Sequence, residues 1–413
     1  LDTSSDPSTK YCEYTKETSC TITGLSLLEQ TYYWKIKAFD GLNSTITSVR
    51  SFETLSKTEE WTAAISDSSQ VVTDVSGDGQ YIVAGNRGDT LYFYESGDST
   101  AVWSSDLDCD IRDVILSDDA EYMAAGRCNY LNFYDTNATT GTVNVQLLWT
   151  YTLSSTIYDA DLDISSDGQY VLICNDNANK LVVLSKYSNT PLWTSPIDCR
   201  EARFSADGQF IAAIDDASNL VYKYHISSSS PLFSLPAVNP YGVDISYDGY
   251  VVAVHGGSSG DHYVSIYHGN FHTRTIVKDD QHSDKNVKLS ADGSCVAIRD
   301  YNSQVLVYKS SDNFSSYTTY STTENGWENG WFSMTPDCKY LAMIVYDNTN
   351  EGVYYFGIDD SSSPLWYHKY SSSGYYRHVK ISDEGRVVVT GLDNTDTNLI
   401  VYNWDYAPEA TLY

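Results

Sequence analysis

A four-residue phrase, Ser-x-Asp-Gly with close variants, recurs eight times along the chain. Its copies begin at Ser76, Ser117, Ser165, Ser205, Ser246, Ser290, Thr335 and Ser382, so the repeat is 40 to 48 residues long. Asp and Gly supply the side-chain hydrogen bond and the positive φ that tight hairpin turns need. A repeat of this length, with one hairpin turn in each copy, predicts the blades of a propeller.

Strand patterns flank each turn. The residues one and three positions before it are apolar, as at Val114 and Leu116, and a short apolar run follows it, as at 81–85. A third segment ends on an aromatic residue in most copies, and a fourth carries another aromatic residue. The fourth-segment aromatics are Trp103, Trp149, Trp193, Phe233 and Trp366. Four strands in each copy are what one propeller blade contains.

The ends of the repeat array indicate how the ring closes. The eighth copy ends after its third segment at Tyr402, while an isolated fourth-segment phrase around Trp61 precedes the first copy. We therefore expect residues near 60–68 to supply the last strand of blade 8, which leaves no sheet edge open at the closure. The predicted fold is all-β, with an eight-bladed β-propeller over residues 56–406.

From about residue 59 to residue 404, the repeats resemble the WD-repeat-like and quinoprotein-like propeller superfamilies. This resemblance implies the fold and little about function, because propellers host unrelated activities. The Gly-His and Trp-Asp dipeptides of true WD repeats do not recur from blade to blade, which argues against an intracellular scaffold. The recurring fourth-strand Trp is similar to the docking Trp of quinoprotein dehydrogenases, but the adjacent cysteine pair of many members is absent.

Residues 1–55 form a different unit. The phrases Thr-Ile-Thr-Gly-Leu and Thr-Tyr-Tyr-Trp-Lys-Ile-Lys-Ala resemble the second half of a fibronectin type III domain, with Tyr32 in the place of the tyrosine-corner residue. The side chains of Tyr32, Trp34 and Ile36 are then expected to alternate inward. A whole sandwich needs about 90 to 100 residues. The N-terminal unit is therefore a partial sandwich, whose apolar face something else has to cover.

The last seven residues, 407–413, resemble the opening strand of a fibronectin type III domain. Two interpretations follow. Either the chain is one period of a longer tandem array, or the tail of one subunit inserts into the partial sandwich of the next by strand addition. Both predict a head-to-tail homopolymer. The expected assembly surface comprises Tyr32, Trp34, Ile36, Leu412 and Tyr413.

The eight cysteines fall into neighbouring pairs on the predicted blades. One pair lies across strands one and two of blade 2, one joins blades 3 and 4, one lies next to the turns of blades 6 and 7, and one flanks a hairpin of the N-terminal unit. The predicted bridges are Cys109–Cys128, Cys174–Cys199, Cys295–Cys338 and Cys12–Cys20. Disulfides favour an oxidising, extracellular compartment. The alternative is eight buried free thiols.

Three Asn-x-Ser/Thr sequons, at Asn43, Asn137 and Asn313, agree with an extracellular, glycosylated protein. The chain carries 55 acidic and 25 basic side chains, a formal net charge of −30 at pH 7. Such a charge repels phosphate backbones and anionic lipids, so nucleic acid and membrane surfaces are not expected partners. No apolar run approaches the ~20 residues that span a bilayer.

The most suggestive polar residues are expected along the central channel, because strand alternation turns the positions two and four before each turn inward. Asp113 and Glu201 are among them. A basic set recurs just above them in every second blade, at Arg112, Arg200, Lys285 and Arg377. These side chains either form a funnel for an acidic or hydroxylated ligand such as a glycan, or pair with one another between blades. Pairing is favoured, because charge pairs are ordinary on protein surfaces.

The sequence contains no motif that predicts catalysis. Gly256-Gly-Ser-Ser-Gly260 matches a nucleophile elbow, but it would link two strands instead of a strand and a helix. The histidines of blade 5 are irregularly spaced, and the phrase Asp74, Ser76, Asp78 lacks the downstream Glu of a calcium loop. We therefore expect no catalytic residues, no metal site and no cofactor.

These features favour a secreted structural subunit of an extracellular fibre, sheath or surface array. If the basic side chains of the central channel bind a glycan, the protein is instead a cell-surface adhesin or glycan-binding propeller, which is the alternative. A quinoprotein-like enzyme is the third interpretation, and it rests on the fourth-strand tryptophans alone.

Overall fold

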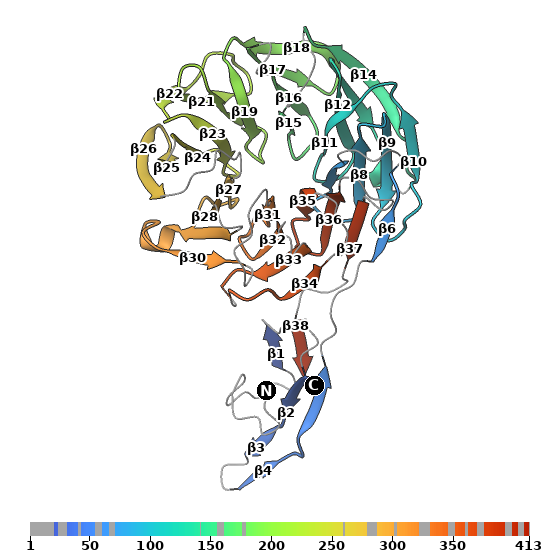
Figure 1. The fold of residues 1–413 in the computed structure, drawn as a ribbon, viewed down its shortest axis with the longest axis vertical. Coiled ribbons are helices and arrows are strands. Elements are labelled where there is room, and N and C mark those ends of the chain that lie inside the picture. Colours follow the sequence, from blue (N-terminus) through green and yellow to red (C-terminus); the bar gives the residue numbers. More distant parts are fainter. Residues whose placement is uncertain are drawn as a thin grey trace.

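The computed structural model of the protein is a ring of eight four-stranded antiparallel sheets with a smaller unit attached to it (Figure 1). The described residues are 20–23, 31–39, 43–53, 60–65, 71–140, 142–154, 161–175, 179–258, 261–278, 287–300, 304–321, 331–345, 352–359, 362–369, 376–392, 399–403 and 409–412. Eight blades of the predicted kind are therefore confirmed.

The first strand of each blade lies innermost and surrounds the centre of the ring (Figure 1). The inner strands are β7 (Val71–Val75), β11 (Ile111–Leu116), β15 (Asp161–Ile164), β19 (Cys199–Phe204), β23 (Pro240–Ile245), β27 (Val287–Leu289), β31 (Phe332–Met334) and β35 (Tyr376–Ile381). The second strands are β8 (Tyr81–Asn86), β12 (Tyr122–Arg127), β16 (Tyr170–Asn175), β20 (Phe210–Asp215), β24 (Val251–Ser258), β28 (Cys295–Asp300), β32 (Tyr340–Val345) and β36 (Val387–Leu392).

The third and fourth strands complete each sheet toward the rim of the ring. The third strands are β9 (Thr90–Glu95), β13 (Tyr130–Asp135), β17 (Lys180–Ser185), β21 (Leu220–His225), β25 (Asp261–His268), β29 (Gln304–Lys309), β33 (Gly352–Gly357) and β37 (Leu399–Asn403). The fourth strands are β10 (Trp103–Asp106), β14 (Gln146–Thr152), β18 (Ser188–Ser195), β22 (Phe233–Pro236), β26 (Phe271–Lys278), β30 (Tyr317–Tyr320), β34 (Trp366–Lys369) and β6 (Trp61–Ala63).

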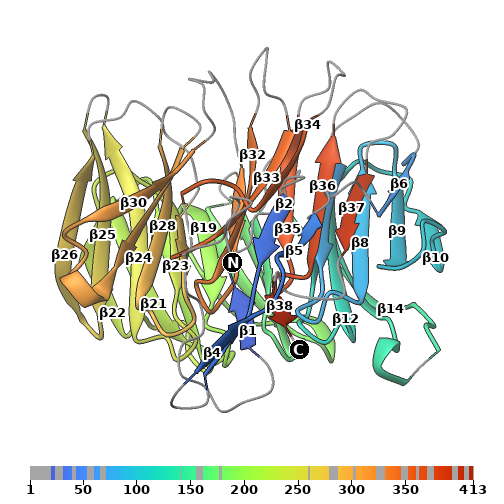
Figure 2. The same ribbon diagram turned by 90° about the horizontal axis from the view of Figure 1, so that it is seen from below.

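The N-terminal strand β6 closes the ring, as predicted. It pairs antiparallel with β37 of blade 8, with Trp61 opposite Val401 and Ala63 opposite Leu399. The fourth strand of blade 8 thus comes from the opposite end of the propeller sequence. Seen from the side, the strands of all blades run between two faces of the ring (Figure 2).

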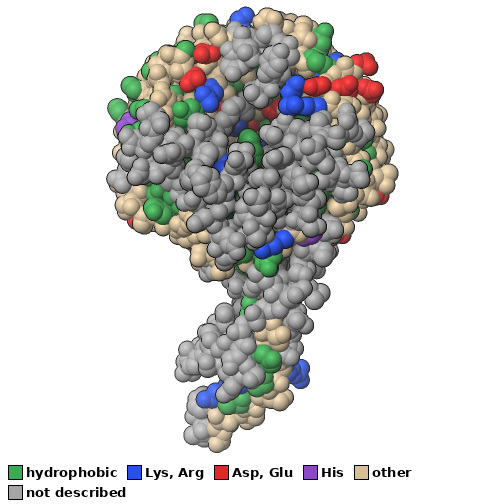
Figure 3. All heavy atoms as spheres, viewed as in Figure 1, with side chains coloured by type: hydrophobic (Ala, Val, Ile, Leu, Met, Phe, Trp, Pro, Cys, Tyr) green, Lys and Arg blue, Asp and Glu red, His purple; other side chains and the backbone are tan. Residues whose placement is uncertain are grey.

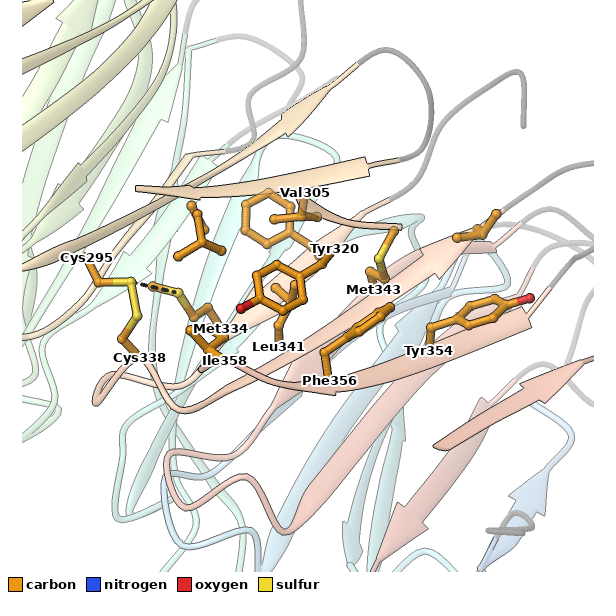
Figure 4. Packing of buried hydrophobic residues seen from close by; sticks show 14 residues of the cluster. Cys295, Val305, Tyr320, Met334, Cys338, Leu341, Met343, Tyr354, Phe356 and Ile358 are labelled. Atoms are coloured by element: carbon orange, nitrogen blue, oxygen red, sulfur yellow. Dashed lines mark hydrogen bonds between the residues drawn. A yellow bond between two sulfur atoms is a disulfide. The ribbon is translucent and has the colours of Figure 1, made fainter. Parts of the chain in front are cut away.

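Hydrophobic side chains fill the space between neighbouring blades. In β28, Cys295 packs toward blade 7, whereas Val296 and Ile298 pack toward blade 5. Between blades 6 and 7, the rings of Tyr320 and Phe356 meet edge to face with centroids 5.6 Å apart (Figure 4). Because both faces of a second strand are buried, it reads in sequence as a continuous apolar run instead of an alternating one.

The repeated phrase forms the hairpin turn between the first and second strands, on what we name the turn face. In blade 1, Ser76 Oγ donates to Asp78 Oδ1 at 2.7 Å, and Gly79 has a φ of 72°. The hydroxyl-to-carboxylate bond recurs in blades 2 to 7. Ala120 and Cys338 take the positive φ in blades 2 and 7, where Gly is absent. In the calcium-like phrase of blade 1, the side chains of Ser76 and Asp78 thus cap the turn.

In its described residues, the smaller unit contains three two-stranded antiparallel sheets. The pairs are β1 (Cys20–Thr23) with β38 (Glu409–Leu412), β2 (Thr31–Trp34) with β5 (Arg50–Glu53), and β3 (Lys37–Phe39) with β4 (Ser44–Ile46). Strand β1 near the N-terminus and strand β38 near the C-terminus therefore meet in this unit, below the ring in Figure 1. The predicted tail strand forms, and here it pairs within its own chain.

The apolar residues of β2 and its continuation are not buried alike. Tyr32 is buried and Trp34 is half-buried, whereas Ile36 is 45% exposed. The expected inward alternation fails at Ile36 because β2 ends at Trp34 and the next strand starts only at Lys37. An interrupted strand does not keep the two-residue period that would turn Ile36 inward.

Candidate functional site

A row of carboxylates connects the inner strands of successive blades. Each accepts a hydrogen bond from a backbone N–H of the next blade. The acceptor and donor pairs are Asp74 with Leu116 (2.9 Å), Asp113 with Leu162 (3.0 Å), Asp163 with Phe204 (2.6 Å), Glu201 with Val243 (2.9 Å) and Asp244 with Leu289 (2.7 Å). These acidic residues, with the expected Asp113 and Glu201 among them, thus join blades 1 to 6 in order.

Basic side chains neutralise part of this row. Nζ of Lys380 lies 3.1 Å from Oδ1 of Asp74, which joins blade 8 to blade 1. Desolvation opposes the charge of Lys380, but the carboxylates of Asp74 and Asp113 outweigh it and raise the pKa of this lysine. Within blade 4, Arg203 donates to Glu201 at 2.6 Å. The carboxylates are therefore engaged by the protein itself.

Asp163 of this row has a perturbed carboxyl group. Burial raises its pKa to about 6, although Arg203, the backbone N–H of Phe204 and Lys288 act in the opposite direction. A perturbed pKa often marks a functional carboxyl group, but structural networks perturb pKa values as well. Because Oδ2 of Asp163 accepts the Phe204 N–H at 2.6 Å, we assign this group to blade connection.

The basic set expected above the row pairs locally. Arg112 donates to Asp110 at 2.7 Å, two residues away on the same blade. Arg200 donates to Asp216 of its own blade at 3.2 Å, and its guanidinium lies 4.6 Å from the ring centroid of Tyr241 in blade 5. Each described arginine of the set thus has a carboxylate partner within its own blade.

An ion pair of the expected kind, between blades, joins Lys380 to Asp74, whereas Arg112 and Arg200 pair within their own blades. Asp113 and Glu201 do connect blades, but through backbone N–H donors of the next blade. The physical reason is that each inner strand has one edge without a strand partner, and its N–H groups require acceptors. The side chains of Lys285 and Arg377 lie outside the described residues, so their contacts stay a prediction.

Backbone hydrogen bonds also join the turns of neighbouring blades on the turn face. Gly77 N–H donates to the carbonyl of Asp118 at 2.9 Å, and Asp383 N–H donates to the carbonyl of Gly77 at 2.9 Å. The series continues from Asp118 to Ser166, Tyr247 to Ala291 and Ala291 to Pro336. Blades 8, 1 and 2 are thus joined at their turns as well as at their inner strands.

Two carboxyl groups flank Gly77 on the turn face. A Cβ at Gly77 would lie 2.8 Å from Oδ2 of Asp383 and 3.3 Å from Cβ of Asp118. Desolvation, followed by the charge of Asp118, raises the pKa of Asp383 to about 6. Desolvation also raises the pKa of Asp118.

Within the part of the chain that is described, no group of three His, Cys, Asp or Glu residues could hold a metal ion.

Three of the four predicted disulfides are present. They are Cys109–Cys128, Cys174–Cys199 and Cys295–Cys338, with Cα–Cα distances of 6.0, 5.2 and 6.3 Å. The last joins blades 6 and 7, and Sγ of Cys295 lies 4.0 Å from Sδ of Met334 (Figure 4). Cys20 begins β1, but Cys12 lies outside the described residues, so the fourth bridge stays a prediction.

Two of the three sequons lie in connections between the third and fourth strands of a blade. Asn137 precedes the short 3-10 helix η1 (Ala138–Thr140) between β13 and β14, and Asn313 follows η3 (Ser310–Asp312) between β29 and β30. Asn313 and Asn43 are exposed, whereas Asn137 is half-buried. Their glycosylation stays a prediction.

The fourth-strand tryptophans have a role that the sequence reasoning missed. The indole N–H of Trp61 donates to the carbonyl of Ser96 at 2.7 Å, and that of Trp193 donates to the carbonyl of Ile226 at 2.7 Å. Trp149 makes the same contact with Lys186 at 3.0 Å. Each bond crosses from one blade to the next, so recurrence of Trp at this position was the signal available in the sequence.

The weaker motifs do not assemble a site in the described residues. Gly256 and Gly257 lie in β24, which forms a hairpin with β25, so no strand-to-helix elbow is present there. His268 stacks on Tyr250, and His272 shares a hydrogen bond with Thr275. Of the described segments, none is a helix long and apolar enough to cross a membrane.

Comparisons with known proteins extend the fold assignment. No protein-family model and no curated protein matches this chain. The crystal structure of the C-terminal WD40 domain of Sif2 aligns with a TM-score of 0.65 and 12% identity, covering 85% of this chain and 99% of that one. The β-propeller domain of Myceliophteria thermophila Cps50 (Swd1) aligns with a TM-score of 0.54 and 10% identity, covering 71% and 96%. At these identities the likeness concerns the fold alone.

Proposed function

We propose that this protein is a secreted structural subunit of an extracellular fibre, sheath or surface array. Its copies assemble head to tail through the smaller unit, which we interpret as a partial fibronectin type III sandwich. The observation that carries the proposal is the apolar surface that this unit leaves uncovered.

Three apolar side chains near the hairpin β3–β4 face solvent. Ile36 is 45% exposed, Ile46 is 54% exposed and Val49 is 42% exposed. Figure 3 shows hydrophobic side chains on this part of the unit, with basic side chains beside them. Contiguous apolar surface on a soluble protein usually marks an interaction site. A two-stranded hairpin is also only marginally stable without further packing.

The charge distribution supports contact between the smaller unit of one copy and the propeller of another. Residues 1–55 carry five basic and seven acidic side chains, whereas the rest of the chain carries 20 and 48. Around the hairpin, Lys37 and Arg50 are exposed. Two propellers repel each other, while this weakly charged, locally basic unit can approach a propeller. A contact between two different surfaces continues from copy to copy, and it produces a fibre where the rotation between copies does not close a ring.

The disulfides support the secreted location. Three bridges within one chain are typical of oxidising compartments and rare in the cytosol. The sequons at Asn43 and Asn313 are exposed and so compatible with attached glycans.

Electron microscopy of the purified protein over a range of concentrations tests the proposal. We expect fibres or sheets in the wild type, and their loss in the double variant Ile36→Ser/Ile46→Ser, which removes the apolar surface of the smaller unit. Val102→Ser is the matched control, because Val102 is similarly exposed at 44% but lies on the propeller. Isolated monomers of the wild type at all concentrations would reject the structural function.

A glycan-binding adhesin is the second candidate. Arg200, Asp216 and Tyr241 place a guanidinium, a carboxylate and an aromatic ring together on the ring surface, and such groups recognise sugars. Binding to a glycan array that is lost in Arg200→Ala but retained in Arg386→Ala supports this function. Arg386 is a suitable control because it also pairs with a carboxylate, that of Glu384, elsewhere on the protein.

A further inference from the structure

We propose that strand β38 is exchanged between copies, so that Glu409–Leu412 of one copy pairs with β1 of the next in the register observed within the chain. This inference rests on the proposed head-to-tail assembly and names its joint. The partner is a second copy of the same chain.

The register of the pair defines the joint. Four positions are opposite each other, from Cys20 with Leu412 to Thr23 with Glu409, in an antiparallel ladder. In the described part of the molecule, β38 is the one strand that pairs with β1. A strand delivered by another copy can form the same backbone hydrogen bonds, because the ladder does not depend on which chain supplies it.

The propeller is complete without β38. Strand β37 is already paired on both sides, with β36 and with β6. Tyr402, near the end of β37, is fully buried against Trp366 with ring centroids 4.9 Å apart. Release of β38 therefore breaks no strand pairing in blade 8.

The connection to the propeller limits where the next copy can sit. β37 ends at Asn403 and β38 begins at Glu409. Six residue steps span at most about 21 Å when fully extended. An exchanged strand therefore places the smaller unit of one copy beside blade 8 of the other.

The geometry of exchange has two outcomes. If each copy donates to the next, the contact is between unlike surfaces and the series stays open, as in a fibre. If two copies donate to each other, a closed dimer results. Both outcomes contain the same β1–β38 ladder.

A disulfide placed across the ladder tests the exchange. Thr21 and Thr411 are directly opposite, and opposite residues of an antiparallel pair have Cα atoms about 4.5–5.5 Å apart. That spacing suits a disulfide. We expect the variant Thr21→Cys/Thr411→Cys, assembled and then oxidised, to form a ladder of covalent multimers on a non-reducing gel. Thr21→Cys/Glu409→Cys is the matched control, because these positions are out of register and should give no ladder.

Peptide mapping makes the result decisive. Heavy-isotope and light copies are mixed in equal amounts before assembly, and the linked peptides that contain positions 21 and 411 are weighed. Exchange predicts that about half of the links join a heavy to a light chain, as random pairing requires. Links only within one chain, or no link at these positions, would overturn the exchange.

The same experiment separates this inference from the proposed function. Fibres that contain only links within chains reject the exchange and leave the fibre function standing. Covalent dimers between chains without fibres support the exchange and reject the fibre function. Circular dichroism of each variant checks that the propeller remains folded.

Discussion

The propeller and the smaller unit are both built from antiparallel strands, but they differ in how far their apolar side chains are buried. In the propeller each four-stranded sheet is covered on both faces by its neighbours, so that Trp366 and Phe133 are fully buried. In the smaller unit the sheets have two strands each, and Ile46 remains 54% exposed. In a closed ring, the apolar faces of every blade are buried against the neighbouring blades. A unit outside the ring has no such neighbours, so it depends on a partner to cover its apolar surface.

The largest difference is expected for a buried aromatic side chain. Trp366 stacks between Tyr355 and Tyr402, with ring centroids 5.4 and 4.9 Å away. We expect Trp366→Ala to lower the free energy of unfolding by about 3–5 kcal/mol, because it leaves a cavity between blades 7 and 8. The exposed counterpart Ile46→Ala should change it by less than about 0.5 kcal/mol. Urea denaturation monitored by circular dichroism measures both, and equal losses would contradict the comparison.

Removal of a disulfide from the propeller should give the second-largest loss in the free energy of unfolding. The bridge between Cys174 and Cys199 joins blades 3 and 4 across 25 residues. Replacing both cysteines by Ala should lower the free energy of unfolding by about 2–4 kcal/mol, since the unfolded chain regains freedom. The midpoint of urea unfolding measures the loss. An unchanged midpoint would mean that this bridge does not contribute to the stability of the ring.

Loss of one hydrogen bond at the ring closure should lower the free energy of unfolding by a smaller amount. The change Trp61→Phe removes the hydrogen bond to the Ser96 carbonyl but keeps an aromatic ring near Tyr94, whose centroid is 5.3 Å away. We expect a loss of about 1 kcal/mol. Trp34→Phe in the smaller unit is the control and should leave the propeller transition unchanged. A shift of that transition in the control would show that the two regions unfold together.

The smallest expected effect is the dependence on pH at the turn face. Because the folded protein raises the pKa of Asp383 to about 6, it binds a proton there that the unfolded chain releases. Stability from this group is therefore present at low pH and is lost as the pH rises from about 4 through 6. Both Asp383 and Asp118 keep contact with solvent, so we expect about 1 kcal/mol or less after screening.

The variant Asp383→Asn tests this sign. It should be more stable than the wild type at pH 7.5 and should lose most of the difference at pH 5, in thermal unfolding at constant ionic strength. A variant that is less stable than the wild type at pH 7.5 would show that the Asp383 carboxylate stabilises the ring instead.

Much of the propeller could be predicted because its information is local and repeated. The spacing of the Ser-x-Asp-Gly turns fixes where each strand lies within a blade, and the isolated phrase at Trp61 has one place left to fill. Knowing the position within a blade was enough to pair Cys109 with Cys128 and Cys174 with Cys199. Each of these predictions depends on counting residues from a turn.

The remaining features depend on how separate elements are placed against one another. Asp113 and Glu201 were recognised as polar residues near the centre, but their partners are N–H groups of the next blade, whose height is set by the stagger between sheets. Ile36 is exposed because a strand is interrupted, and β38 meets β1 across nearly the whole sequence. The sequence by itself determined the repeat, the turns and the closing strand, since these follow from local backbone preferences and a regular apolar pattern. The tertiary structure decided which atoms meet between blades and at the two chain ends, because those distances are set by packing and not by spacing along the chain.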